Sequence, residues 1–205
     1  MPVHSPAAQY LVLHGFENAQ PAEHWQHQLV DRLRDTGAEV SYPAFPDPWH
    51  PKLDAWLERF TDAAAEISSD APLTVIAHSL GTLTWLHAAA AGLAPQATTR
   101  VLLVAPVTPL ALRPEPRIDA AFSELADLHS FDARALPYDT SAVLGTADPY
   151  RSDDHEQIYL DQLHIPLLLV PQAGHFVIEE GYGSWPSLDA WALDPGRSIR
   201  ANPAA

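Results

Sequence analysis

The chain has no cysteine, few positive charges and no long apolar run, and each shortage excludes a class of protein. Without cysteine there is no disulfide, no thiolate zinc site and no cysteine nucleophile. The 26 acidic residues outnumber the 11 basic ones, which gives a net charge of −15. The basic residues are scattered, and Lys52 is the only lysine. Nucleic acid and anionic membrane surfaces would repel such a chain, so neither is expected as a partner.

The sequence also lacks targeting and nucleotide-binding signatures. No basic stretch precedes the first apolar run, residues 10–16, which is too short for a signal-peptide core or a membrane span. A soluble, cytoplasmic protein is therefore expected. No G-x-G-x-x-G, Walker loop or H-E-x-x-H is present, so no cofactor and no metal are expected.

Length and patterning together predict a single α/β domain. The 205 residues correspond to one domain by size. Short apolar runs of strand length recur, and three of them are almost unbroken, which is typical of strands covered on both faces. These runs are residues 10–13, 73–77, 101–105, 141–144 and 167–170, with a weaker one at 38–42.

Helical patterns separate the strands. Apolar side chains recur at helical spacing over residues 25–33 and 53–67, and residues 80–93 are rich in alanine and leucine. Residues 118–128, 153–163 and 187–193 are also expected to be helical. Strand and helix alternate about six times, which predicts a three-layer α/β fold with about six mostly parallel strands.

The domain is expected to span residues 1–194, and residues 195–205 are expected to form a flexible tail. The longest irregular stretch, residues 107–140, holds either a small cap over a site or a wandering crossover helix. We expect little or no lid.

Three chemically suited residues follow three of these strands. Ligands of open parallel sheets bind beyond the carboxyl ends of the strands, so the residues there decide the chemistry. Ser79, Asp148 and His175 each occupy such a position, in that chain order. A serine, an acid and a histidine are the components of a nucleophilic triad. Their joint placement predicts that these three residues are catalytic.

The segment around Ser79, Ala-His-Ser-Leu-Gly, closely matches the nucleophile elbow G-x-S-x-G. The turn demands small residues two before and two after the serine. Gly81 satisfies that demand, and Ala77 departs from the strict glycine. The alternative is that Ser79 merely caps the helix that follows it.

The acid and the base also have alternatives. Asp148 precedes a proline and is a possible turn residue, and Asp153 and Asp154 are rivals for the acid role. The two rivals are better explained as the start of the next helix, where acids favour the dipole. The chain has 11 histidines, and His175 is singled out by following the last strand directly after Gly174.

Backbone N–H groups near these residues are candidates for an oxyanion hole. Leu80 begins the helix after Ser79, so its N–H is free to donate. Gly15, after the first strand, allows close backbone approach, and the N–H of Phe16 is the second candidate. We expect the apolar walls of an acyl pocket to come from Phe16, Leu80, Phe176 and Trp185.

Two other clusters have weaker explanations. His24 and His27 can share a helix face, but a pair without a third ligand is more often solvated. Residues 153–156 are acidic with one histidine, and are better explained as a helix start than as a cation site.

Over about residues 9–194, the sequence resembles a known family, the small α/β-hydrolases of the retinoblastoma-binding-protein-9 and YdeN type. The motifs that carry the resemblance are His14-Gly15 with His24-Trp25, Ala77-His78-Ser79-Leu80-Gly81, Asp148-Pro149-Tyr150, Gly174-His175-Phe176 and Gly181-Tyr182-Gly183-Ser184-Trp185-Pro186. The resemblance implies a compact serine hydrolase with Ser79, Asp148 and His175 as its triad, and several such proteins are esterases acting on short acyl chains.

The expected function is therefore cofactor-free hydrolysis of a small carboxylic ester or amide. His175 must be neutral to act as a base, so activity should fall as the pH drops through roughly 6 to 7. Two alternatives stay open at this stage. One is a non-catalytic binding or scaffold protein on a hydrolase fold, and the other is an acyltransferase or lyase that uses the same loops.

Overall fold

The structure, a computed structural model, describes residues 7–112, 114–124 and 136–202. Its centre is a six-stranded sheet in the order β2-β1-β3-β4-β5-β6, and every neighbouring pair is parallel. The strands are β1 (Gln9–Leu13), β2 (Glu39–Ser41), β3 (Leu73–His78), β4 (Thr98–Val104), β5 (Asp139–Gly145) and β6 (Leu167–Val170). The expected α/β fold with about six parallel strands is confirmed.

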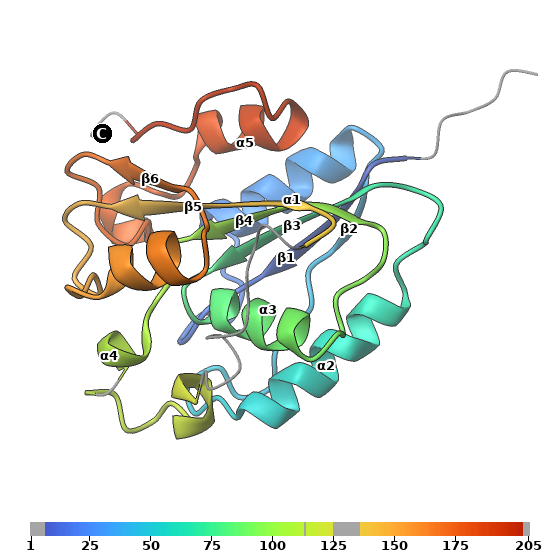
Figure 1. Cartoon of the computed structure of the whole chain (residues 1–205). Helices are drawn as coiled ribbons and strands as arrows, with labels where there is room; N and C mark the ends of the chain where they lie inside the picture. The colour runs from blue at the N-terminus through green and yellow to red at the C-terminus, as the bar shows by residue number, and fades with distance from the viewer. Residues whose placement is uncertain (1–6, 113, 125–135, 203–205) are drawn as a thin grey trace, which may run out of the picture.

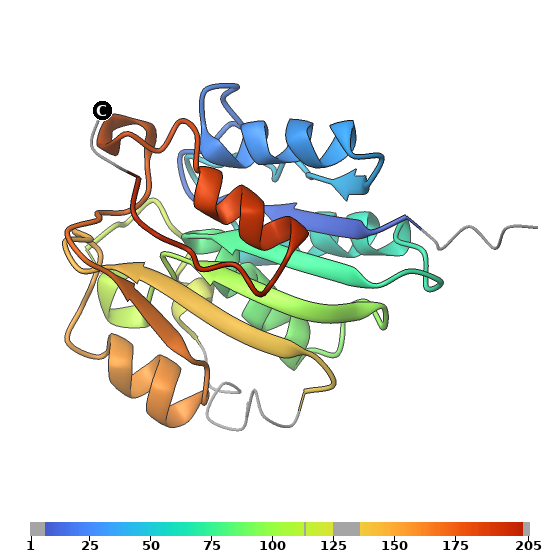
Figure 2. The ribbon, with the colours of Figure 1, turned by 90° about the horizontal axis from the view of Figure 1, so that it is seen from above.

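Helices cover both faces of the sheet, so the molecule has three layers (Figures 1 and 2). Helices α1 (Trp25–Asp35) and α5 (Pro186–Leu193) lie on one face, while α2 (Leu53–Ala65) and α3 (Leu80–Ala90) lie on the other. All residues of β1 and β3 are buried, because these central strands are covered on both sides. This double burial explains their nearly unbroken apolar sequences.

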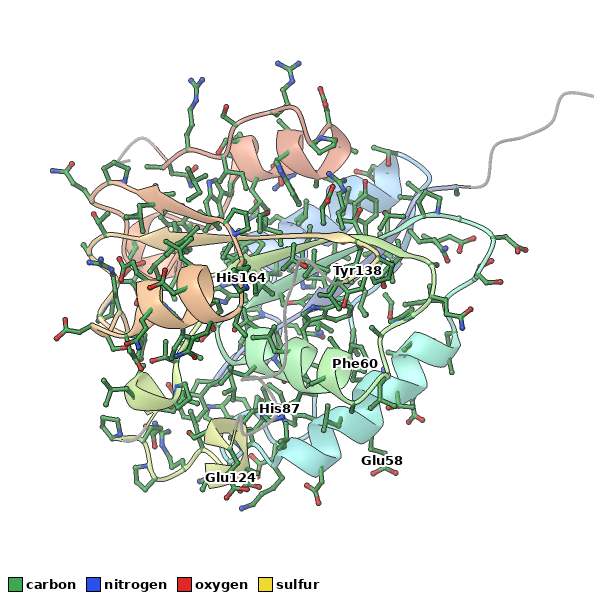
Figure 3. The ribbon with its side chains drawn as sticks, in the orientation of Figure 1. Glu58, Phe60, His87, Glu124, Tyr138 and His164 are labelled. Carbon is green, nitrogen blue, oxygen red and sulfur yellow. The ribbon has the colours of Figure 1, made fainter. Side chains whose placement is uncertain are left out.

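Each face of the sheet has its own apolar core. On the α2 and α3 face, Phe60 contacts Trp85 with ring centroids 6.0 Å apart, and Phe60 lies between the two helices (Figure 3). On the α1 and α5 face, the rings of Trp25 and Trp185 meet edge to face at 5.6 Å. These cores hold the strand ends in fixed relative positions.

The strand order places a crevice at one end of the sheet. From β1 the chain moves outward to β2, then returns to β3 and continues outward to β6. The loops after β1 and β3 therefore leave the sheet at the point where the order reverses, which is where open α/β sheets bind ligands.

Two expected helices differ in detail. Two short helices, α4 (Pro109–Leu112) and η1 (Ala120–Ser123), are present where a helix from residue 118 was expected. Residues 125–135 lie outside the described residues. The helix expected over 153–163 contains η4 (Gln157–Gln162), which is a π-helix. In that stretch the N–H of Leu163 donates to the carbonyl of Ile158, five residues back.

Residues beyond α5 pack against the domain. Ile199 is buried in the core on the α5 face, and the indole of Trp185 donates to the carbonyl of Arg200 at 2.7 Å. From residue 195 onward, a flexible tail is the expectation from the sequence. Instead, residues 199 and 200 make these contacts, because Ile199 and the indole of Trp185 find their partners only in the folded chain. Residues 203–205 lie outside the described residues.

Candidate active site

Ser79 lies in a strained turn between β3 and α3. Its backbone has φ 53° and ψ −125°, in the positive-φ half of the Ramachandran map, which residues other than glycine seldom adopt. The Ser79 N–H donates to the carbonyl of Val104 at 3.0 Å, and the Thr82 N–H donates to the Ser79 carbonyl at 2.9 Å. The Ser79 hydroxyl makes no capping hydrogen bond to α3. The predicted nucleophile elbow requires such a strained turn, and the helix-capping alternative is not observed.

The close approach of α3 to the end of β1 explains why a glycine follows the elbow. A Cβ at Gly81 would lie 2.5 Å from the His14 carbonyl oxygen and 2.9 Å from that of Leu13. The glycine therefore meets the backbone of β1. This contact packs the start of the helix against the loop that carries Gly15 and Phe16.

Ser79, His175 and Asp148 form one continuous line of hydrogen bonds. His175 Nε2 lies 2.8 Å from Ser79 Oγ, and His175 Nδ1 lies 2.8 Å from Asp148 Oδ2. Because a carboxylate only accepts, Nδ1 carries the proton and Nε2 accepts from the serine hydroxyl. The side chains of His175 and Asp148 are almost completely buried. The structure therefore brings the three predicted residues together in hydrogen-bonding order.

Asp148 is held in place from two sides. Its second oxygen, Oδ1, accepts the N–H of Tyr150 at 2.8 Å. A Cβ at Gly145 would lie only 2.2 Å from the carbonyl oxygens of Ala173 and Gly174. The loop with Asp148 thus lies directly against the loop that leads into His175.

The rival acids are placed elsewhere. Asp154 accepts from Thr108 Oγ1 at 3.0 Å and bonds to Ser152 Oγ at 2.5 Å. Asp153 is exposed. Neither is hydrogen bonded to His175, so Asp148 is the acid that the geometry supports.

Two backbone N–H groups beside Ser79 are free to bind an oxyanion. Leu80 is the first residue of α3, and Phe16 lies in the loop after β1. Within the described part of the chain, neither N–H donates a hydrogen bond. Free donors at this position fit the negative oxygen that develops during acyl transfer.

Gly15 holds the Phe16 loop against the nucleophile, which leads to a prediction. A Cβ at position 15 would lie 2.7 Å from Ser79 Cβ and 3.2 Å from Ser79 Oγ. Gly15→Ala should displace the serine and lower kcat for an ester substrate by about 100-fold. Esterase kinetics on the purified variant measures this. Gly196→Ala is the control, since its Cβ would approach only the exposed carboxylate of Asp194, at 3.2 Å. Equal activity of the two variants would contradict the prediction.

A pocket of about 420 Å³ opens directly above Ser79 and His175. Its apolar wall comes from the loop after β1, the start of α3 and the segment 107–118. The residues of this wall are Phe16, Leu80, Val107, Leu112 and Ile118.

Two of the four expected pocket residues do not line the pocket. Phe16 and Leu80 do, whereas Phe176 and Trp185 are completely buried in the core on the α5 face. Their rings stack with centroids 4.5 Å apart. Phe176 has a φ of 57°, which turns its side chain away from the pocket that His175 faces. This part of the pocket prediction is corrected.

Polar residues also contribute to the rim. Glu17, Glu179 and Glu180 bring carboxylates to the lining. The guanidinium of Arg117 stacks 4.7 Å from the centre of the Phe16 ring and pairs with Glu17 at 2.5 Å. The segment around residue 117 is thereby fastened to the loop with the candidate oxyanion donor.

Three further histidines surround the site, and sequence reasoning did not assign them a role there. His14, His24 and His78 are all buried. Burial lowers the pKa of His14 to about 4, and burial is also the main reason that the pKa of His24 is lowered to about 4. The signals available in the sequence were the pairs His14-Gly15 and His24-Trp25, and the place of His78 directly before Ser79. The expectation that His24 is solvated is wrong, since it caps α1 by accepting the N–H of Gln26.

These lowered pKa values predict acid sensitivity of folding. In the unfolded chain His14 and His24 titrate near 6.5, and in the folded chain near 4. Between these pH values the unfolded state binds more protons, so stability falls as the pH drops through this window. Each ring should contribute a loss of about 3 kcal/mol in the free energy of unfolding.

Urea unfolding at several pH values measures this loss. His24→Asn is the informative comparison, because its amide oxygen can still accept from Gln26 while the titrating group is gone. The variant should lose less stability than wild type between pH 6.5 and 4. Identical pH dependences would contradict the assignment.

Within residues 7–112, 114–124 and 136–202, no three His, Asp or Glu side chains are grouped to hold a metal ion. Over the same ranges, no helix is long and apolar enough to span a membrane.

Comparison with known proteins identifies the family. No curated protein sequence matches the chain significantly. Among solved structures, a putative YdeN-like hydrolase from Pectobacterium atrosepticum is 22% identical, with 91% of this chain and 90% of that chain covered and a TM-score of 0.69. The ydeN gene product of B. subtilis is 20% identical, with 92% and 97% covered and a TM-score of 0.70.

A third similar structure is the esterase domain of a protein from Rhodothermus marinus, 15% identical, with 93% and 88% covered and a TM-score of 0.66. These likenesses show a common α/β-hydrolase fold. The family model described as serine hydrolase matches residues 10–192, which is most of the sequence. The chain therefore belongs to the serine hydrolase family.

Proposed function

We propose that the protein hydrolyses a small carboxylic ester or amide through an acyl-enzyme intermediate, with Ser79 as nucleophile, His175 as base and Asp148 as the orienting acid. One observation carries the proposal. The line of hydrogen bonds from Ser79 Oγ to His175 Nε2 and from His175 Nδ1 to Asp148 Oδ2 has a separation of 2.8 Å at both steps. Ser79 and His175 both line the pocket, where a substrate carbonyl can reach the serine.

The first half of the reaction forms the acyl-enzyme. Ser79 Oγ attacks the carbonyl carbon, and its proton passes to His175 Nε2. The carbonyl oxygen becomes negative and accepts hydrogen bonds from the N–H groups of Phe16 and Leu80. When the carbonyl re-forms, the bond to the leaving group breaks, and His175 gives its proton to the departing oxygen or nitrogen.

The second half releases the acid. Water attacks the acyl carbon, His175 Nε2 takes its proton, and Ser79 Oγ leaves and recovers that proton. Throughout, the Asp148 carboxylate keeps the proton of His175 on Nδ1 and stabilises the imidazolium. The original serine proton leaves with the alcohol or amine and a proton of the water replaces it, so the enzyme returns to its starting state and the cycle needs no cofactor.

The pocket favours a short, uncharged acyl chain. Its volume of about 420 Å³ is near the lower end for small-molecule sites. Carboxylates of Glu17 and Glu179 lie on its rim, and Arg117, the cation beside it, is paired with Glu17 and Glu115. An anionic acyl group would therefore meet carboxylates and, among the described residues that line the pocket, no unpaired cation.

The proposal is tested by covalent labelling together with turnover. A fluorophosphonate should attach to the protein, and peptide mass spectrometry should locate it on Ser79. p-Nitrophenyl acetate and p-nitrophenyl butyrate should both be hydrolysed in buffer without added metal or cofactor. Labelling at a different residue would overturn the proposed mechanism.

Two alternative functions give distinct results in the same experiment. A non-catalytic binding protein would show neither labelling nor turnover. An acyltransferase would label at Ser79, but would transfer its acyl group to an added alcohol or amine acceptor in preference to water. Analysis of the products with and without such acceptors separates transfer from hydrolysis.

A further inference from the structure

His78, the residue immediately before the nucleophile, contacts the loop that carries the base. Its Nε2 lies 2.9 Å from the carbonyl oxygen of His175, and the two rings have centroids 5.1 Å apart. The side chain is buried. His78 takes no part in the proposed proton transfer, although its hydrogen bond joins the end of β3 directly to the loop after β6.

The hydrogen bond determines which nitrogen of His78 carries a proton. A carbonyl oxygen can only accept, so Nε2 must be the donor. Nδ1 then keeps a lone pair, and no partner for it is found among the described residues. Burial and the neighbouring histidines lower the pKa of His78 well below its usual value, so the ring stays neutral.

His24 offers the complementary group. Its Nδ1 accepts the N–H of Gln26 at 3.2 Å, which leaves the proton on Nε2. The rings of His24 and His78 are neighbours, with centroids 5.5 Å apart, and His24 lines the pocket. His24 therefore carries an N–H and His78 an unpaired lone pair on neighbouring rings.

The loop after β6 needs such anchoring because its backbone is strained. Phe176 has a φ of 57°, a strained conformation that persists only when neighbouring contacts impose it. Two side chains donate to consecutive carbonyls there. His78 donates to His175, and the indole of Trp25 donates to Phe176 at 3.0 Å.

We propose that His78 is a positioning residue for this site. Its Nε2–H holds the backbone of His175, and thereby sets the direction in which the imidazole meets Ser79 and Asp148. The inference rests on the proposed function, because the base it positions is the base of that reaction. His78 itself exchanges no proton with the substrate.

A matched pair of amide variants tests the proposal. In His78→Gln the amide nitrogen can occupy the position of Nε2 and donate to His175, whereas in His78→Asn it is one bond too short. The asparagine and glutamine side chains are both polar and no larger than histidine, so both variants can be accommodated at the site. Fluorophosphonate titration counts the competent sites, so kcat is expressed per active site and a partly unfolded sample does not distort it.

The expected result is a split between the two variants. His78→Asn should lower kcat by about 10- to 100-fold with little change in KM, because a misdirected base slows chemistry more than binding. His78→Gln should restore most of the rate. Equal kcat in both variants, whether at the wild-type level or equally reduced, would overturn the positioning role.

A measurement without turnover separates this inference from the proposed function. The proton on His175 Nδ1 that bonds to Asp148 should give a low-field proton NMR signal, assigned by its loss in His175→Gln. The signal should persist in His78→Gln and shift or broaden in His78→Asn. If wild type shows this pattern but hydrolyses no ester, the proposed function fails and the positioning role stands. An unchanged signal in His78→Asn would contradict the positioning role directly.

Discussion

Ser79→Ala is expected to lower kcat for p-nitrophenyl acetate by about 10⁶-fold, to the level left by binding and the oxyanion donors alone. The reason is that no other nucleophile lies within hydrogen-bonding distance of His175 Nε2 in the described chain. The folded structure should persist, because the Ser79 hydroxyl makes no helix-capping bond and alanine fits the same turn.

Ester hydrolysis and fluorophosphonate labelling of the purified variant measure this effect. Both should vanish together, while the thermal unfolding midpoint stays close to that of wild type. Ser69→Ala is a suitable control, since it removes a hydroxyl from an exposed serine that does not line the pocket. Ester turnover that survives in Ser79→Ala at the wild-type rate would rule out Ser79 as the nucleophile.

Asp148→Asn has the second largest expected effect, a loss of about 10⁴-fold in kcat. The carboxylate accepts the Nδ1 proton of His175 at 2.8 Å, and so leaves Nε2 free to accept from Ser79. An amide that turns its N–H₂ toward His175 would favour the opposite tautomer, with the proton on Nε2. That ring could not take the proton of the serine.

The pH dependence of kcat and the rate of fluorophosphonate labelling test this prediction. Labelling of Asp148→Asn should be slow but should still occur at Ser79, since the nucleophile and the oxyanion donors stay in place. Asp153→Asn is the matched control, because Asp153 is an exposed acid only five residues along the chain. A larger loss in Asp153→Asn than in Asp148→Asn would reassign the acid.

The local signals of the sequence were sufficient for the fold and for the three candidate catalytic residues. Apolar runs of four or five residues alternate with helical periods, and this alternation depends on nearest neighbours in the chain, which the sequence displays directly. Ser79, Asp148 and His175 could be selected because each follows such a run. The parallel order of the strands then places all three at one edge of the sheet.

The walls of the pocket and the state of the surrounding histidines depended on contacts between distant parts of the chain. Phe176 follows His175 directly, yet its ring stacks on Trp185 in the core because the backbone reverses at φ 57°. Nothing in the residues near position 176 signals that reversal, since Trp25 and Trp185 impose it from elsewhere in the chain.

The sequence by itself determined which chemical groups lie at the ends of the strands, because strand ends are set by local hydrophobicity. Only the tertiary structure decided how those groups are aligned. The line from Ser79 through His175 to Asp148 forms because Gly15, Gly81 and Gly145 let separate loops approach to distances that a side chain would prevent. Such approaches join residues far apart in the chain, so packing, and not local pattern, determines them.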